Sequence, residues 1–121
     1  MTERIEFVLP YPPTVNTYWR RHGNTYFISE AGKRYRRDVA LIVRQQRLKL
    51  NLSGRLAIRI TAEPPDKRHR DLDNILKAPL DALTHAGLLI DDEQFDEINI
   101  VRGQTVPGGR LGIKITELEC A

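Results

Sequence analysis

The chain changes its hydrophobic period between Gly54 and Gly87, and this change constrains the fold more than any other feature. From Gly54 to Ala62 apolar residues alternate with polar ones, which predicts a half-buried β-strand. From Leu72 onward apolar residues recur at helical spacing, and Gly87 is typical of the residue just past a helix end. The sequence therefore predicts a strand, a loop and a helix in succession.

The same periods give the remaining elements. The expected strands lie at 5–9, 54–62, 98–100 and 111–115, the last two paired as a hairpin, and the expected helices run from Ser29 to about Leu50 and from Leu72 to Gly87. Pro79 should kink the second helix or make it restart, because proline lacks the backbone N–H. We predict an α+β fold in a single domain, residues 1–121, with a mixed β-sheet of about four to five strands packed with two main helices.

Residues 14–27, TVNTYWRRHGNTYF, are expected to form a loop that follows the proline cluster of the first strand. Aromatic and basic side chains are interleaved in it, which suits stacking on bases and pairing with phosphates. The alternative is that Tyr18 and Trp19 anchor the loop in the core while the arginines face solvent.

Charge is distributed unevenly along the chain. Residues 1–70 contain 15 Lys and Arg against 6 Asp and Glu, whereas residues 71–121 contain 4 against 10. The first part is typical of a surface that faces a polyanion, and the second of one that binds a metal ion. Cys120 is the only cysteine, so a disulfide framework is excluded and a reducing, cytoplasmic compartment is expected. The first residues are charged, and the chain contains no long apolar run. Neither secretion nor insertion into a membrane is therefore expected.

The helix that begins after Ser29 has two different faces. Its expected inner face carries apolar residues, namely Ala31, Tyr35, Val39, Ile42, Val43 and Leu50. Its expected outer face carries cations, namely Lys33, Arg37, Arg44 and Arg47. A solvated charged face is one interpretation, and contact with nucleic acid is the other, which the scarcity of acids on this face favours.

Two acidic clusters suggest one shared ion site. Asp71 and Asp73 precede the second helix, and Asp91, Asp92 and Glu93 follow it. Oxygen ligands without a cysteine or a histidine pair favour Mg²⁺, for which Mn²⁺ can substitute, over zinc. Lys77 lies one helical turn after Asp73, where its charge would stabilise the transition state of phosphodiester hydrolysis. The plainer interpretation is an N-cap and an ordinary i, i+4 ion pair.

Cations also surround these acids and extend the expected DNA-binding surface. The loop before Asp71 is strongly basic, and the aromatic loop also contains arginines. The candidate DNA-binding residues outside the helix are Arg20, Lys67, Arg68 and Arg70.

Three segments of the chain resemble the RusA-type endodeoxyribonucleases, small resolvases of four-way (Holliday) junctions: LPYPPTVNTYWR, RDLDNILKAPLDALTHAGLLIDDEQ and GGRLGIKITE. The resemblance implies that Asp71, Asp73 and Asp92 bind the metal and that Lys77 is catalytic, with Asp91 a further candidate ligand. It implies a mixed α/β fold, a homodimer, a four-way DNA junction as partner, Mg²⁺ as cofactor and paired symmetric nicks in recombination and repair.

Two other functions compete with this hypothesis. One is a catalytically inactive junction-binding protein of prophage origin. The presence of all three carboxylates and the lysine argues against this loss of catalysis. The other is a metal-dependent phosphohydrolase or sugar-nucleotide enzyme, which usually places its Asp-x-Asp motif after a strongly apolar strand. Here the preceding residues are basic.

Overall fold

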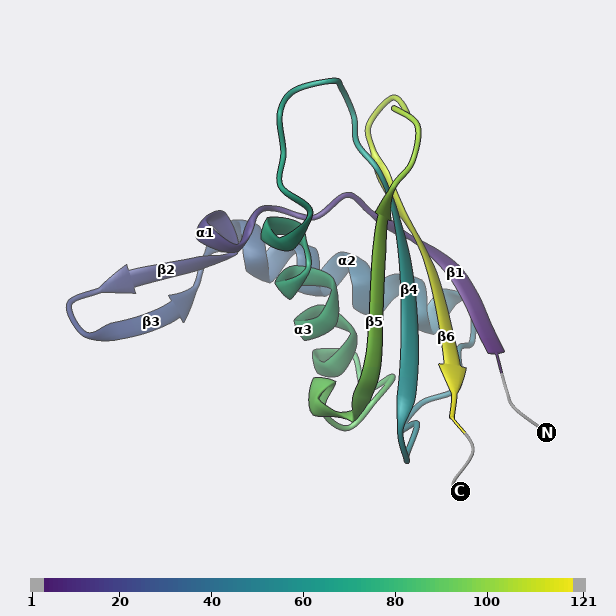
Figure 1. The fold of residues 1–121 in the computed structure, drawn as a ribbon. Helices are drawn as coiled ribbons and strands as arrows, with labels where there is room; N and C mark the ends of the chain where they lie inside the picture. The colour runs from purple at the N-terminus through teal and green to yellow at the C-terminus, as the bar shows by residue number, and fades with distance from the viewer. Residues whose placement is uncertain (1–3, 119–121) are drawn as a thin grey trace.

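A computed structural model describes residues 4–118, which form a four-stranded sheet, two principal helices and a separate hairpin (Figure 1). The strands are β1 (Arg4–Pro10), β2 (Trp19–His22), β3 (Thr25–Ile28), β4 (Leu56–Glu63), β5 (Phe95–Arg102) and β6 (Arg110–Glu117). The helices are α1 (Val15–Tyr18), α2 (Glu30–Gln45) and α3 (Lys77–His85), with 3₁₀ turns η1 (Leu72–Ile75) and η2 (Asp92–Gln94). Cys120, on which the expectation of a reducing compartment depends, lies outside the described residues.

The main sheet is mixed, as predicted, and has the strand order β1-β6-β4-β5. Strand β6 is antiparallel to both β1 and β4, whereas β5 runs parallel to β4. The predicted hairpin between the last two strands is wrong, because β4 lies between them. Parallel neighbours need a crossover connection, and α3 supplies it between β4 and β5.

One face of the sheet is buried under the helices. In β4 the alternate residues Leu56, Ile58, Ile60 and Ala62 are buried, which confirms the period-two pattern. They pack in one core with residues of α2 and α3 such as Val39 and Leu83. Figure 1 shows both helices on the same side of the sheet.

Helix α2 begins where predicted and ends earlier. The Ser29 side chain accepts a hydrogen bond from the Gly32 N–H at 3.0 Å, as an N-cap does. The helix stops at Gln45 because Arg47 adopts φ 53°, a left-handed conformation that a helix cannot continue. The expected inward position of Leu50 is therefore wrong, since it is exposed.

Pro79 marks a restart of the second helix. The chain first makes the 3₁₀ turn η1 and then begins α3 at Lys77, so that Pro79 falls in the first turn of α3. Backbone N–H groups in the first turn have no partner within their own helix, and the missing donor therefore costs little there. Gly87 has φ 86° and ends the helix as predicted.

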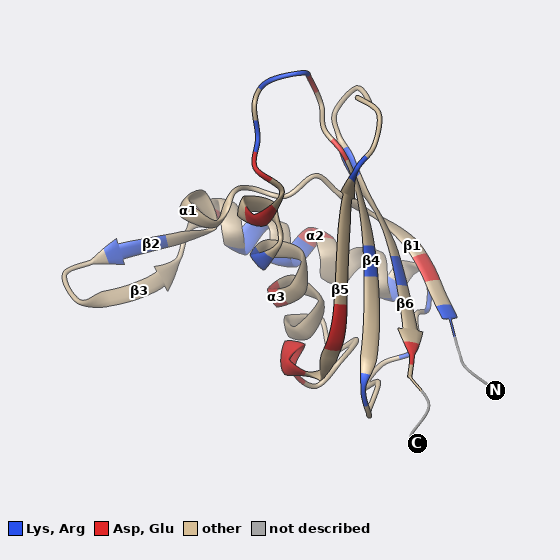
Figure 2. Ribbon diagram, in the orientation of Figure 1, with Lys and Arg blue, Asp and Glu red and all other residues tan. Residues whose placement is uncertain are grey.

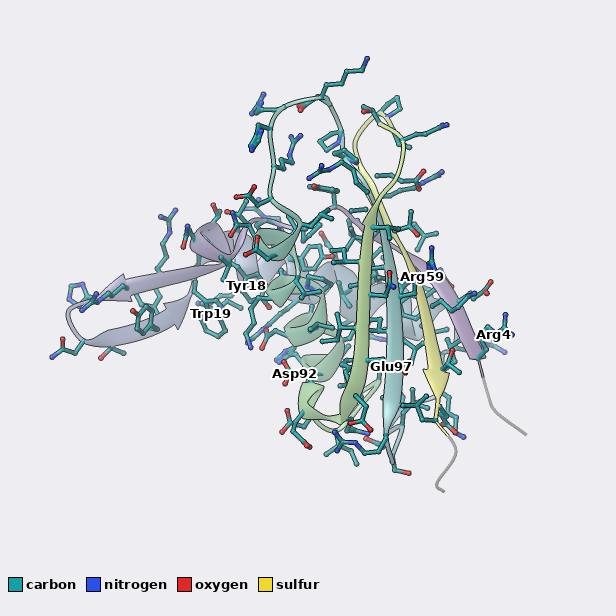
Figure 3. All side chains as sticks on the ribbon, in the orientation of Figure 1. Arg4, Tyr18, Trp19, Arg59, Asp92 and Glu97 are labelled. Atoms are coloured by element: carbon teal, nitrogen blue, oxygen red, sulfur yellow. The ribbon has the colours of Figure 1, made fainter. Side chains whose placement is uncertain are left out.

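The segment expected to be an aromatic loop is ordered, and this prediction was wrong. It forms α1 and the antiparallel hairpin β2–β3, which projects away from the main sheet (Figure 1). Tyr18 is fully buried and Trp19 is partly buried, where the hairpin joins the body (Figure 3). Among the described residues, no helix is long and apolar enough to cross a membrane.

Candidate active site

The 3₁₀ turn before α3 positions the first two predicted carboxylates. Asp71 is the N-cap residue of η1 with extended backbone angles, and Asp73 lies in the first turn. The Asp71 carboxylate makes no capping hydrogen bond and is well exposed, with the His69 Nε2 atom 3.7 Å away. The predicted capping role is thus absent for this side chain, which leaves its oxygens available for a ligand.

The structure brings Lys77 and Asp92 together although fifteen positions separate them in the sequence. The Lys77 Nζ atom lies 3.6 Å from Asp92 Oδ2, and both side chains keep access to solvent. Lys77 is the first residue of α3, and Asp92 begins η2. The contact therefore joins the two sequence segments that were predicted to share one site.

The turn η2 gives its neighbouring acids different roles. Asp91 is the N-cap, and its carboxylate accepts a hydrogen bond from the Glu93 N–H at 3.3 Å. The buried Gln94 side chain accepts from the Ile90 and Asp91 N–H groups at 2.8 and 2.9 Å. Its amide also donates to the carbonyls of Leu52 and Gly54, both at 2.9 Å. These bonds fix the turn, so Asp91 is used structurally while Asp92 is left to face Lys77.

The carboxylates match a hard divalent cation in donor type, but they are not assembled into a cage. Figure 2 shows acidic segments at the two ends of α3, in the stretch that leads into it and in the turn that follows it. Between residues 4 and 118, no three His, Cys, Asp or Glu side chains are grouped so that they could hold a metal ion. Mg²⁺ is usually bound by one or two carboxylates together with water and substrate phosphate, so a preassembled group of three is not required.

A basic hollow of about 410 Å³ adjoins Asp71. Its cationic lining consists of Lys67, Arg68, Arg70 and Arg102, together with His69. Arg68 is well exposed, whereas Arg70 is mostly buried and is held 2.7 Å from Asp66. Arg70 also lies over the ring of Tyr11 at 5.7 Å. Arg70 therefore shapes the loop, and Lys67 and Arg68 are the cations that the loop presents.

Of the four cations predicted on the long helix, three lie on α2 and one lies beyond its end. Lys33, Arg37 and Arg44 lie on the exposed side of α2, and Lys33 is 3.7 Å from Glu30. Arg47 lies beyond the end of the helix and does not continue this row. Arg20 is on β2 and belongs to a separate surface on the hairpin.

Sequence reasoning missed a polar cluster that ties three helices together. The Tyr18 hydroxyl donates to Asp81 Oδ2, and Arg36 donates to the same oxygen at 2.9 Å. Burial raises the pKa of Tyr18, and the hydrogen bond with Asp81 raises it further, so the phenol stays protonated. The cluster holds α3 against α1 and α2. Its members lie 18 or more positions apart, and no periodic signal connects them.

A sequence model described as "Endodeoxyribonuclease RusA" matches residues 10–116 of the chain. The chain belongs to the RusA family. Among similar proteins of the RusA family is the crossover junction endodeoxyribonuclease of Enterobacteria phage HK97, which is 61% identical over 114 residues, covering 94% of this chain and 95% of the relative. The RusA proteins of Escherichia coli K12 and Enterobacteria phage 82 are 42% and 43% identical over 110 residues, with 91% of this chain and 92% of each relative covered. The resemblance found in the sequence is thereby confirmed at the level of the RusA family.

Proposed function

We propose that the protein is an endodeoxyribonuclease that resolves four-way DNA junctions, and that it acts as a homodimer to nick two strands symmetrically in recombination and repair. Membership of the RusA family supports the reaction class. The observation that carries the site assignment is the contact between Lys77 and Asp92, because it places a cation and a carboxylate from two distant segments side by side.

In this proposal Asp71, Asp73 and Asp92 bind a divalent cation, Mg²⁺ with Mn²⁺ as a substitute, together with oxygens of the DNA phosphate. The exposure of Asp71 and the absence of a capping bond at its carboxylate support its availability as a ligand. The bound ion would polarise the scissile phosphate and lower the pKa of a water molecule. Asp91 is better explained as the N-cap of η2.

The other side chains bind and orient the DNA. The ammonium of Lys77 compensates negative charge that gathers on the phosphate as the bond to the leaving oxygen breaks. Lys67 and Arg68 of the basic loop bind neighbouring backbone phosphates, which positions the strand beside Asp71. The exposed cations of α2, Lys33, Arg37 and Arg44, add sequence-independent affinity.

The decisive experiment incubates the purified protein with a synthetic four-way junction labelled on each strand. With Mg²⁺ we expect two nicks at symmetric positions, and chelation should abolish them. A linear duplex of the same arm sequence serves as the control and should stay intact. Binding of the junction without nicks in Mg²⁺ and in Mn²⁺ would instead indicate a junction-binding protein without catalysis.

A further inference from the structure

The hairpin β2–β3 exposes large aromatic side chains beside cations. Tyr26 is 66% exposed and Phe27 is 47% exposed, whereas most large apolar side chains in the described chain are in the core. Residues 19–28 contain Arg20 and Arg21 and no acidic residue. Aromatic surface left in solvent on a cationic element marks a binding surface, and the charge selects an anionic partner.

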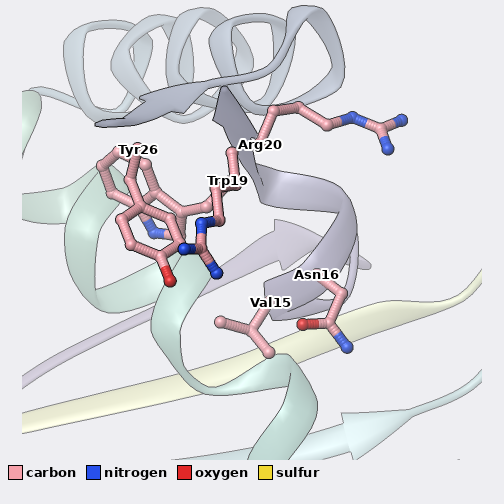
Figure 4. Close-up of a pocket in the computed structure, with 6 residues that line it drawn as sticks. Val15, Asn16, Trp19, Arg20 and Tyr26 are labelled. Atoms are coloured by element: carbon pink, nitrogen blue, oxygen red, sulfur yellow. The ribbon is translucent and has the colours of Figure 1, made fainter. Parts of the chain in front are cut away.

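A cavity of about 630 Å³ lies between this hairpin and α1 (Figure 4). Its lining combines two aromatic rings with two arginines, an amide and an apolar side chain: Val15, Asn16, Trp19, Arg20, Arg21 and Tyr26. In Figure 4 Trp19 and Tyr26 lie on one side of the view, Val15 and Asn16 lie across from them, and Arg20 extends away. A cavity of this size falls in the range that accommodates a small planar ligand.

The ring of Trp19 is fixed from outside the cavity. Its neighbour Tyr18 meets it edge to face, with 5.5 Å between the ring centres. Arg36 lies over the Trp19 ring at 5.9 Å and is itself held 2.9 Å from Asp81. Because these partners are buried or partly buried, the ring is held in place before a ligand arrives, and a ligand need not order it.

Tyr26 is positioned by a cation on the same hairpin. The Arg21 guanidinium lies 5.8 Å from the centre of the Tyr26 ring, a cation–π contact. Arg21 can keep this contact and still offer N–H donors to a phosphate at the mouth of the cavity. Asn16 supplies both a donor and an acceptor, which match the edge of a heterocyclic base.

Helix α1 links the cavity to the candidate active site. Helix α1, which provides Val15 and Asn16, packs against η1, which carries Asp73. A nucleotide with its base in the cavity would therefore belong to the strand near the predicted catalytic carboxylates. Bases at a branch point are easier to unstack than bases within a duplex, since less stacking and pairing must be broken.

We propose that this cavity binds an unstacked nucleobase from the branch point of the DNA junction by stacking it on Trp19 and Tyr26. The inference rests on the proposed function and adds a structure-selective contact to it. Base–aromatic stacking tolerates every base, because each has a π-face, so the site recognises an unpaired base and not a sequence.

The test measures equilibrium affinity for two junctions by fluorescence anisotropy without a divalent cation. One junction is intact, and the other has abasic sites at the nucleotides flanking the branch point. For the wild-type protein we expect affinity to fall about 5- to 100-fold on the abasic junction. Tyr26→Ala should lose a similar factor on the intact junction and nothing further on the abasic one.

Two variants control for trivial effects. Phe27→Ala removes an exposed aromatic ring from the same hairpin but outside the cavity lining, and it should bind both junctions like the wild type. Tyr26→Phe keeps the ring and should retain the discrimination. Tyr26 is largely solvent-exposed, so its truncation leaves the core intact.

Three results would overturn the inference. Tyr26→Ala could behave as wild type on both junctions, or it could weaken both equally, which would mean that no base occupies the cavity. Light scattering could show that Tyr26→Ala changes the oligomeric state, which would assign the hairpin to a second copy of the chain.

If the wild type nicks the junction while one of these results is obtained, only the base-binding inference fails. If the wild type neither binds nor nicks it, the proposed function fails as well.

Discussion

The ammonium of Lys77 lies 3.6 Å from the carboxylate of Asp92, and this contact connects the start of α3 with the turn that precedes β5. An ammonium at this distance neutralises part of the charge of Asp92. A metal ion and a DNA phosphate would bring charges of opposite sign into the same place. In the proposed mechanism the pair would provide a carboxylate for the ion and a cation for the phosphate.

Asp71→Asn should keep junction binding and abolish cleavage, because the amide removes a negative charge without removing bulk. We expect nicking of a four-way junction in Mg²⁺ to slow by about 100-fold or more. The affinity, measured in a gel-shift assay, should stay close to that of the wild type. Asp96→Asn is a matched control, since Asp96 is occupied by Arg55 at 2.6 Å. Loss of binding by Asp71→Asn would indicate a structural role for the carboxylate.

Arg44→Glu combined with Arg47→Glu should weaken DNA binding and flatten its salt dependence. Each lost phosphate contact lowers the slope of log Kd against log salt concentration by about 0.9. The measurement is a salt titration of junction affinity. Arg4→Glu with Lys114→Glu makes the same change in net charge on β1 and β6 and serves as the control. An unchanged slope in the double variant would remove the carboxyl end of α2 and the residue that follows it from the interface.

Gly32→Ala should destabilise the protein, although alanine normally favours a helix. A Cβ atom at position 32 of α2 would lie 2.6 Å from Ile28 Cγ1 and 2.7 Å from the backbone oxygen of Tyr18. We expect the free energy of unfolding in urea to fall by about 1–3 kcal/mol. Gly112→Ala is the control, because its Cβ would lie no closer than 3.7 Å to Thr61. Equal stability of the two variants would contradict the close approach of α2 to Tyr18.

Asp66 should titrate well below an ordinary aspartate. The hydrogen bond from Arg70 lowers the pKa of Asp66 to about 2, and the Arg68 N–H contributes a further bond. Because the pKa is lower in the folded state, the stabilisation is complete above the unfolded value of 3.8 and is lost as the pH falls through about 2. Carbon-13 NMR of the Asp66 carboxyl measures this directly, and Arg70→Gln should raise the midpoint. A wild-type midpoint near 3.8 would exclude the ion pair in solution.

The elements that could be predicted from the sequence are those marked by a pattern of neighbouring residues. The alternation at Leu56, Ile58 and Ile60 identified β4, and Ser29 identified the start of α2, because each depends only on neighbouring residues. The hairpin β2–β3 also had a local signal, since Gly23-Asn24 is a two-residue turn between aromatic and β-branched residues. The basic and aromatic composition hid it and led to the prediction of a loop.

The parts that could not be predicted depend on contacts between distant residues. No glycine or proline marks the end of α2, which stops near Arg47 in a left-handed conformation. The strand order places β4 between β5 and β6, and the sequence alone suggested a hairpin of adjacent strands. Within the candidate site, the spacing placed Lys77 near the carboxylates, but the partnership with Asp92 in particular depends on how the chain returns after α3.

The position of Asp92 is determined through Gln94, whose single amide group holds four main-chain groups belonging to two segments. The placement of this carboxylate therefore depends on the Gln94 amide and the Asp91 cap more than on the exposed side chains beside it. For protein engineering, Glu93 is an exposed position from which to vary the charge beside the site, and its substitution would give up only the ion pair with Arg55 at 3.1 Å. Gln94, in contrast, is the residue that every such redesign would have to leave unchanged.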